Sequence, residues 1–103
     1  LAFTAAAHAD PIEGVWIMPS GDKAEAAACE AGYCLTYIDG EHAGKTFGEF
    51  APTEDGKYEG EITDYTKKGK TYSGKGTLSG NSLKMGGCVL GGLICRNQTW
   101  SRL

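Results

Sequence analysis

Four cysteines are the residues of this chain whose type and spacing most directly suggest chemistry. In a short exported chain, four cysteines usually form two disulfides, and three pairings are possible. We favour Cys29–Cys34 and Cys88–Cys95 because each pair brackets a short, turn-rich insert. Each pair can therefore lie across the mouth of a β-hairpin, where Cβ atoms approach closely enough to bond. A zinc site would need C-x₂₋₄-C spacing with histidine support, a pattern that both pairs fit poorly.

His42 is the main candidate for acid–base chemistry, since it is the only histidine after residue 9. It lies in a glycine-rich loop, and a Ser–His–Asp site would have to combine it with Ser73, Ser79 or Ser82. Nothing in the spacing of these residues supports such a site, so we expect a surface histidine.

Glu59 and Glu61 share one face of a predicted strand and are candidates for a pair of catalytic carboxylates. Alternating acids of this kind are more typical of the wet outer face of a sheet. The glycines lack the strand–loop–helix context of a phosphate-binding loop. We therefore predict that the protein is not an enzyme and has no cofactor and no metal site.

Charge is distributed unevenly along the chain, whose net charge is −3. All 13 acidic residues and three of the 10 bases precede residue 65, so residues 1–64 carry −10 and residues 65–103 carry +7. The simplest interpretation is that the two halves attract each other across strand pairs. The alternative is a basic face for an anionic ligand, a membrane surface or an acidic partner. Nucleic acid is not expected as a partner of an exported protein with an acidic pI.

The length of 103 residues indicates one domain. Residues 1–9 are small and apolar and end in Ala7-His8-Ala9, which fits the end of a secretory signal with an A-x-A cleavage site. We predict a signal-peptide remnant at 1–9, a single domain at 10–103 and a periplasmic or secreted location; the alternative for 1–9 is a leftover of cloning. No stretch approaches the ~18 apolar residues of a membrane span.

Short alternating segments separated by turn residues predict about eight β-strands. The segment 23–29 is ambiguous, because its alanines favour a helix whereas Ala24 and Ala26 alternate with Lys23 and Glu25. We predict a strand there, because a turn precedes it and a cysteine-closed hairpin follows. The predicted strands are 12–18, 23–29, 34–38, 45–51, 58–65, 70–78, 82–89 and 94–103, with a turn at 52–56.

Eight sequential antiparallel strands with short connections would leave exposed edges unless the sheet closes. The predicted fold is therefore all-β, a small antiparallel meander barrel. Glycines at inward positions suit tight curvature and predict a narrow lumen. These glycines are Gly14, Gly60, Gly74 and Gly76.

The last strand carries one small polar face and one face of larger side chains. The larger face, predicted to point inward, consists of Arg96, Gln98, Trp100 and Arg102. An arginine on an inward face needs a partner, and stacking of Arg102 on Trp16 would supply one worth ~1–2 kcal/mol when shielded from water. We predict that Trp16, Trp100 and Arg102 together close the barrel.

Gly14-Val15-Trp16 near the start, with Arg102 near the end, resembles the calycin pattern of lipocalin-like barrels, in which the G-x-W tryptophan packs under a C-terminal arginine. More specifically, the chain resembles a family of small exported bacterial proteins, the domain of unknown function 2147. The resemblance implies a calycin-like barrel and no activity, since the family has none assigned. The matching pieces are DPIEGVW (10–16), the cysteine pair at 29–34, GKTYSGKGTL (69–78), NSLKMGG (81–87) and QTWSR (98–102), whereas Asp64-Tyr65, the region 39–57 and the second cysteine pair depart from the pattern.

Two roles are compatible with these features. We favour a non-enzymatic module that contacts a protein partner through its loops, because the inward glycines leave little room inside. Its candidate contact surface is the apolar tip, residues 89–94, which could instead form a homodimer. The alternative is a carrier or sensor that binds a small ligand in the lumen. Its ligand-binding residues would be Tyr58, Tyr72, Arg96 and Gln98.

Overall fold

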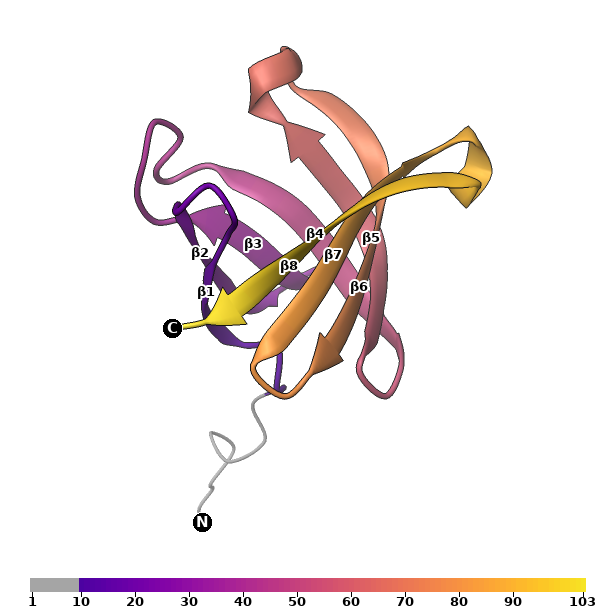
Figure 1. Ribbon diagram of the computed structural model, residues 1–103, viewed down its shortest axis with the longest axis horizontal. Helices are drawn as coiled ribbons and strands as arrows, with labels where there is room; N and C mark the ends of the chain where they lie inside the picture. The colour runs from indigo at the N-terminus through magenta and orange to yellow at the C-terminus, as the bar shows by residue number, and fades with distance from the viewer. Residues whose placement is uncertain (1–9) are drawn as a thin grey trace.

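In the computed structural model, which describes residues 10–103, the chain forms a closed antiparallel barrel of eight strands. Each strand pairs with the next one in the chain, and β8 returns to β1 (Figure 1). The predicted all-β meander barrel is confirmed, and the predicted signal-peptide remnant lies outside the described residues. The strands are β1 (Gly14–Ile17), β2 (Lys23–Cys29), β3 (Gly32–Tyr37), β4 (Thr46–Glu54), β5 (Lys57–Asp64), β6 (Lys70–Ser79), β7 (Ser82–Val89) and β8 (Ile94–Arg102), and the 3₁₀-helices η2 (Tyr65–Lys67) and η3 (Leu90–Gly92) join β5 to β6 and β7 to β8.

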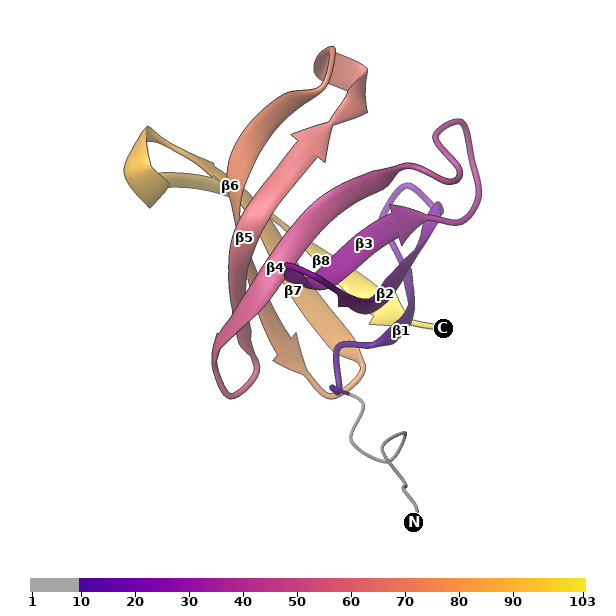
Figure 2. The same cartoon turned by 180° about the vertical axis from the view of Figure 1, so that it is seen from behind.

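Successive connections alternate between the two ends of the barrel (Figure 2). The β1–β2 turn, the β3–β4 loop, η2 and η3 lie at one end, which we term the open end. The other hairpin turns and the residues that precede β1 lie at the opposite, closed end. Because β4–β8 are longer than β1–β3, the wall of the barrel is uneven in height.

The alanine-rich segment 23–29 is strand β2, as its alternation predicted. Ala24 and Ala26 are buried, whereas Glu25 between them is exposed, which is the two-residue period of a half-buried strand. Pairing with β1 on one side and β3 on the other satisfies the backbone of the segment. This tertiary context outweighs the helix propensity of alanine.

The predicted turn at 52–56 is wrong in its first half, because β4 continues through Pro52 to Glu54. The register of β4 against β5 shifts between these two residues. Such an irregularity accommodates proline, which has no N–H to donate to the ladder. The turn is thereby confined to Asp55 and Gly56.

The first strand is also shorter than predicted, since β1 begins only at Gly14. Residues 10–13 form a tight turn in which the Glu13 amide donates to the Asp10 carbonyl oxygen over 2.9 Å. The turn places Ile12 inside the closed end, where its side chain is fully buried. The closed end is therefore plugged by residues outside the sheet.

Trp16 and Arg102 join the two ends of the chain at this plug. The Trp16 indole N–H donates to the Ile12 carbonyl oxygen over 2.9 Å, and its side chain is fully buried. The Arg102 guanidinium carbon lies 4.3 Å from the centre of the Trp16 ring, and its nitrogens donate to the carbonyls of Glu13 and Pro11. A Cβ at position 14 would lie only 3.2 Å from Nη1 of Arg102, so glycine leaves the room that the stacking needs.

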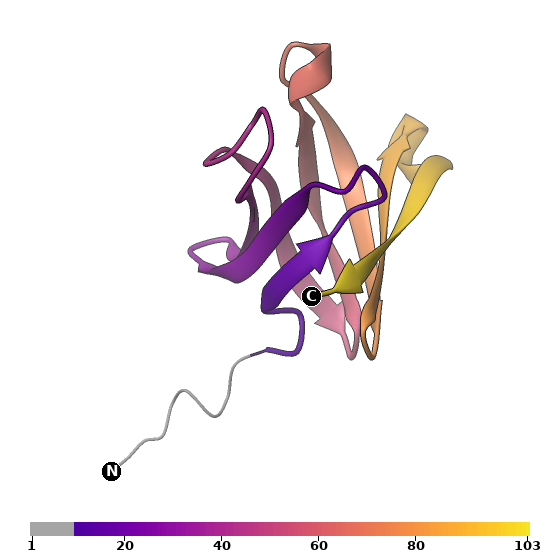
Figure 3. The same ribbon diagram turned by 60° about the vertical axis from the view of Figure 1, so that its left-hand side comes forward.

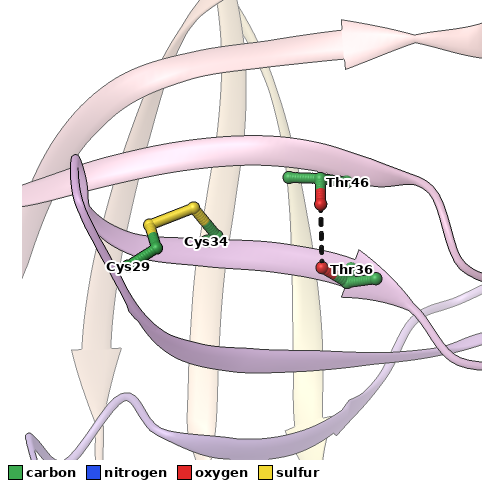
Figure 4. Close-up of a disulfide and its surroundings, with 4 residues drawn as sticks. All are labelled: Cys29, Cys34, Thr36 and Thr46. Atoms are coloured by element: carbon green, nitrogen blue, oxygen red, sulfur yellow. Dashed lines mark hydrogen bonds between the residues drawn. A yellow bond between two sulfur atoms is a disulfide. The ribbon is translucent and has the colours of Figure 1, made fainter.

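Both predicted disulfides are present. Cys29–Cys34 joins β2 to β3, and Cys88–Cys95 joins β7 to β8. Figure 4 shows the first of them beside a hydrogen bond of 3.1 Å between the hydroxyls of Thr36 and Thr46, which links β3 to β4. One hairpin is thus braced near the closed end and the other at the open end.

The barrel closes along a short seam between its first and last strands. β1 and β8 pair only at Trp16↔Arg102 and Ile17↔Ser101. Toward the open end, β8 continues with β7 past the β1–β2 turn to η3 (Figure 3). This part of β8 is therefore bonded to a neighbouring strand on one side only.

Candidate functional site: a cavity at the open end of the barrel

A cavity of about 550 Å³ lies at the open end of the barrel. A volume of this size falls within the range of small-molecule sites in proteins. Its walls come from the inward faces of β3–β8, from η2 and from the residue that follows β1. The lining residues are Met18, Tyr37, Phe47, Ile62, Thr63, Asp64, Lys67, Tyr72, Met85, Gly87, Val89, Ile94, Arg96, Gln98 and Trp100.

The deep part of the cavity is apolar and aromatic. Phe47, Met85 and Trp100 are among the buried core residues. The centre of the Phe47 ring lies 6.0 Å from that of Trp100 and 4.1 Å from that of Tyr37, on which it stacks. The indole N–H of Trp100 donates to Oε1 of Gln98 over 3.0 Å, so its one polar atom is satisfied toward the rim. The floor therefore suits an apolar or aromatic group.

The rim of the cavity carries charges of both signs. Oδ1 of Asp64 accepts hydrogen bonds from the Thr66 hydroxyl (2.5 Å) and the Thr66 amide (2.9 Å). The bond from the hydroxyl is the main cause that lowers the pKa of Asp64, so this carboxylate is charged and caps η2. Lys67 and Arg96 form no ion pair within residues 10–103.

The predicted attraction between the acidic and basic halves is not made by direct ion pairs among the described residues. The two ion pairs found in residues 10–103 are Lys23–Asp39 (3.3 Å) and Lys57–Glu54 (3.5 Å). Both lie within the acidic half of the chain. The bases that follow residue 64 are thus left without a carboxylate at ion-pair distance in this part of the structure, and the rim cations are among them.

Three of the four predicted ligand-binding residues line the cavity. Tyr72, Arg96 and Gln98 lie on its wall, whereas Tyr58 lies at the closed end, where its hydroxyl donates to the Asp10 carboxylate. Burial, followed by this carboxylate, raises the pKa of Tyr58. The two-residue period places Tyr58 on the inward face, but it cannot tell which end of the barrel an inward residue faces.

A protein-family model described as "Uncharacterized protein conserved in bacteria (DUF2147)" matches residues 14–102. This chain belongs to that family. No curated protein and no solved structure matches the chain. The match begins at the first residue of β1 and ends at the last residue of β8, so the whole barrel, with its cavity and its seam, is the DUF2147 unit.

The lumen of this DUF2147 barrel is narrow only in part, which corrects the expectation drawn from its glycines. A Cβ at Gly74 would lie 2.6 Å from Cζ of Phe50, so that ring fills the space beside the glycine. A Cβ at Gly87 would meet its nearest neighbour, Tyr72, at 3.9 Å. A Cβ at Gly87 would therefore have room, and both Gly87 and Tyr72 line the cavity.

His42 is half-buried, which corrects the expectation of a surface residue. Its ring centre lies 5.9 Å from that of Tyr37 and 5.7 Å from that of Tyr65. Nδ1 is buried and has no hydrogen-bond partner among the described residues. The glycine-rich loop looked exposed in the sequence, but aromatic rings from β3 and η2 flank its histidine.

Several lining residues were not predicted as site residues. Met85 is an inward residue of β7, and the two-residue period identifies it once the cavity is known. Phe47 is buried next to Gly48 on β4, where the register against β3 shifts, so a strict two-residue period does not identify it. Asp64 caps η2 and Lys67 is its last residue. A helix this short has no periodic signal in the sequence. Glu59 and Glu61 are exposed on the outer face of β5.

The apolar tip, residues 89–94, projects beside the cavity entrance. Leu90, Leu93 and Ile94 are 69%, 85% and 56% exposed. Val89 and Ile94 also line the cavity, so the tip is continuous with its wall. The tip therefore offers apolar surface both to the cavity and to a partner.

Two further features of residues 10–103 bear on function. None of their helices has the length and apolar character that a membrane crossing requires. No group of three or more histidine, cysteine, aspartate or glutamate side chains in this range is placed to hold a metal ion.

Proposed function

We propose that this DUF2147 protein is an exported, non-enzymatic binding protein that takes a small amphipathic ligand with an anionic group into the open end of its barrel. The observation that carries the proposal is the cavity of about 550 Å³, which has an aromatic floor and a rim where the cations of Lys67 and Arg96 outnumber the single carboxylate of Asp64. An apolar pocket with a few polar groups at its edge is the usual form of a small-molecule site. The closed end, plugged by Ile12 and Trp16, leaves the ligand one way in.

The charge of the rim supports an anionic group on the ligand. Asp64 is engaged in capping η2, whereas the cations of Lys67 and Arg96 have no ion-pair partner within the described part of the chain. Gln98 stands between Arg96 and the Trp100 ring along the inward face of β8, so its amide can orient a polar head above an apolar tail. A guanidinium and an amide at this spacing suit a carboxylate, sulfonate or phosphate.

The two disulfides support export to the periplasm or the medium. Disulfides persist in oxidising compartments and are rare in the cytosol. Short disulfide loops stabilise a small barrel by constraining its unfolded chain. A barrel of this size benefits from such braces, because a chain of this length has only a modest hydrophobic core.

Two fluorescent probes test the ligand class, since 1-anilinonaphthalene-8-sulfonate and N-phenyl-1-naphthylamine differ in the sulfonate. We expect saturable binding of both and tighter binding of the sulfonate. Arg96→Ala should weaken sulfonate binding by about tenfold, because it removes one charge-assisted hydrogen bond, and should change binding of the neutral probe little. Fluorescence titration measures both dissociation constants.

The matched control is Lys84→Ala, which removes a cation from the exposed outer face of β7. It should leave both constants unchanged, as should Leu93→Ser in the apolar tip. The proposed ligand class would be contradicted if Arg96→Ala weakened the binding of both probes equally, or if the unmodified protein bound neither probe saturably. Native mass spectrometry of protein recovered from the periplasm would then identify the retained compound by the mass lost on denaturation.

A second candidate function, contact with a protein partner, is favoured by the exposure of the apolar tip. A photo-crosslinking amino acid at Leu93 should then yield one discrete heterologous adduct in the periplasm, and Leu90→Ser should remove that adduct. The same crosslinker at Thr77, exposed on the outer face of β6, is the control. A smear of adducts that is equal at both positions would rule out a specific partner at the tip.

A further inference from the structure

The part of β8 nearer the open end of the barrel has an unpaired edge. β8 spans nine residues, but only Ser101 and Arg102 pair with β1. Residues 94–99 are all exposed, whereas the neighbouring strand β7 buries Leu83, Met85 and Cys88. An edge of this kind presents free backbone groups that another strand can bind.

Three observations identify which backbone groups face the open edge. The Arg102 amide donates over 2.9 Å to the carbonyl oxygen of Asn81, which lies on the β7 side. The Leu103 amide donates over 2.9 Å to the carbonyl oxygen of Val15, which lies on the β1 side. The Cα atoms of Cys88 and Cys95 are 4.0 Å apart, as in a pair of facing residues that exchange no hydrogen bonds. Even-numbered residues of β8 therefore bond to β7, and odd-numbered residues point away from it.

The free groups are the amides and carbonyls of Cys95, Asn97 and Thr99. None of them has a backbone or side-chain hydrogen-bond partner within residues 10–103. Ser101, the next odd residue, is already paired with Ile17 of β1. The open edge thus consists of three odd-numbered residues in a row.

We propose that this edge binds the same edge of a second copy, so that two β8 strands pair antiparallel about a twofold axis. A twofold arrangement covers both edges at once and leaves neither open. One register pairs every free group of both copies, and it places Asn97 opposite Asn97 of the second copy and Cys95 opposite Thr99. The occupant that fits this edge is therefore another β8.

The side chains of β8 favour the same register. On the cavity side it sets Arg96 opposite Gln98 of the second copy, and an amide oxygen can accept from a guanidinium. Shifting the second copy so that Cys95 faces Asn97 would set two Arg96 side chains opposite each other, and like charges directly opposite are destabilising. The favoured register also brings the rims of the two cavities together, so each copy contributes Gln98 beside the Arg96 of the other.

Amide hydrogen exchange measured by NMR tests the proposal on the unmodified protein. The amides of Arg96 and Gln98, bonded to β7, should be protected at every protein concentration. Those of Cys95, Asn97 and Thr99 should exchange freely in dilute protein and become protected as the concentration rises. If the odd-numbered amides stay unprotected while sedimentation shows a dimer, the copies meet elsewhere and the proposal fails; a monomer at millimolar concentration overturns it as well.

Charge changes at Gln98 test the register. Gln98→Glu places a carboxylate opposite Arg96 twice per dimer and should tighten the dimer roughly tenfold, while Gln98→Arg should weaken it by a similar factor. Ser82→Glu and Ser82→Arg make the same changes of net charge at an exposed position of β7 and should leave the dissociation constant unchanged. Equal effects at both positions, or none at Gln98, would contradict the register. Because the readout is self-association without ligand, its failure leaves the proposed ligand function untouched.

Discussion

Trp16→Ala is expected to destabilise the protein by about 3–5 kcal/mol, a loss typical of a fully buried tryptophan. The side chain has no exposed surface, its indole N–H bonds to Ile12, and the Arg102 guanidinium stacks on its ring. The substitution removes both interactions together with the buried surface of the indole, and it opens a void beneath the residues that plug the closed end. Urea unfolding followed by far-ultraviolet circular dichroism measures the change.

The control is Ile17→Ala, the next residue of β1, which is half-buried on the opposite face. It should cost no more than about 1 kcal/mol, since it leaves the plug and the stacked arginine in place. If the two substitutions cost the same, the closed end does not depend on Trp16. The loss expected for Trp16→Ala is a large share of the total stability of a small domain. The variants and the wild-type protein are compared at the same temperature.

Phe50→Ala is expected to cost a similar amount, about 3–5 kcal/mol, because this ring fills the middle of the lumen. The side chain is 1% exposed, and a Cβ at either Gly48 or Gly74 would lie within 3.0 Å of its ring atoms. Gly74→Ala alone should therefore be destabilising through overpacking, by about 1–3 kcal/mol.

The double variant gives the sharper result. In the Phe50→Ala background the added methyl group of Gly74→Ala enters vacated space, so it should cost little or stabilise. Chemical denaturation of the four proteins yields the interaction free energy of the pair, and contacting residues should couple by about 1 kcal/mol or more. Additive losses would show that Phe50 does not occupy the space beside Gly74.

Much of the fold could be predicted because its signals are local. The alternation of Ala24 and Ala26 with charged residues identified β2 against the helix propensity of alanine, and β2 has the predicted bounds. Both cysteine pairs bracket short turn-rich inserts, and both form disulfides across those hairpins. The predicted bounds of the elements were wrong where the chain is irregular, at Pro52 and before Gly14, since turns and bulges have weaker patterns than strands.

Only part of the candidate site could be predicted from the sequence. The inward face of β8 follows from the two-residue period, and that period selected Arg96 and Gln98. The same period selected Tyr58, which lies at the closed end, because a strand pattern states the face of a residue and not its height in the barrel. Lys67 belongs to η2, and Asp64 caps η2 from the end of β5. The position of η2 over the rim depends on how far β5 and β6 extend.

The amino-acid sequence by itself determined the eight antiparallel strands, the two braced hairpins and the meander order, since alternation, turn residues and cysteine spacing act over a few residues. Only the tertiary structure decided beside which glycines the space is filled by a side chain and beside which it remains part of the cavity. Phe50, from β4, fills the space beside Gly74 of β6, whereas the nearest atom to a Cβ at Gly87 would be Cβ of Tyr72, at the ordinary contact distance of 3.9 Å. The open edge of β8 was decided in the same way, because it results from the difference in length between β8 and β1, and a difference between distant strands has no local signature.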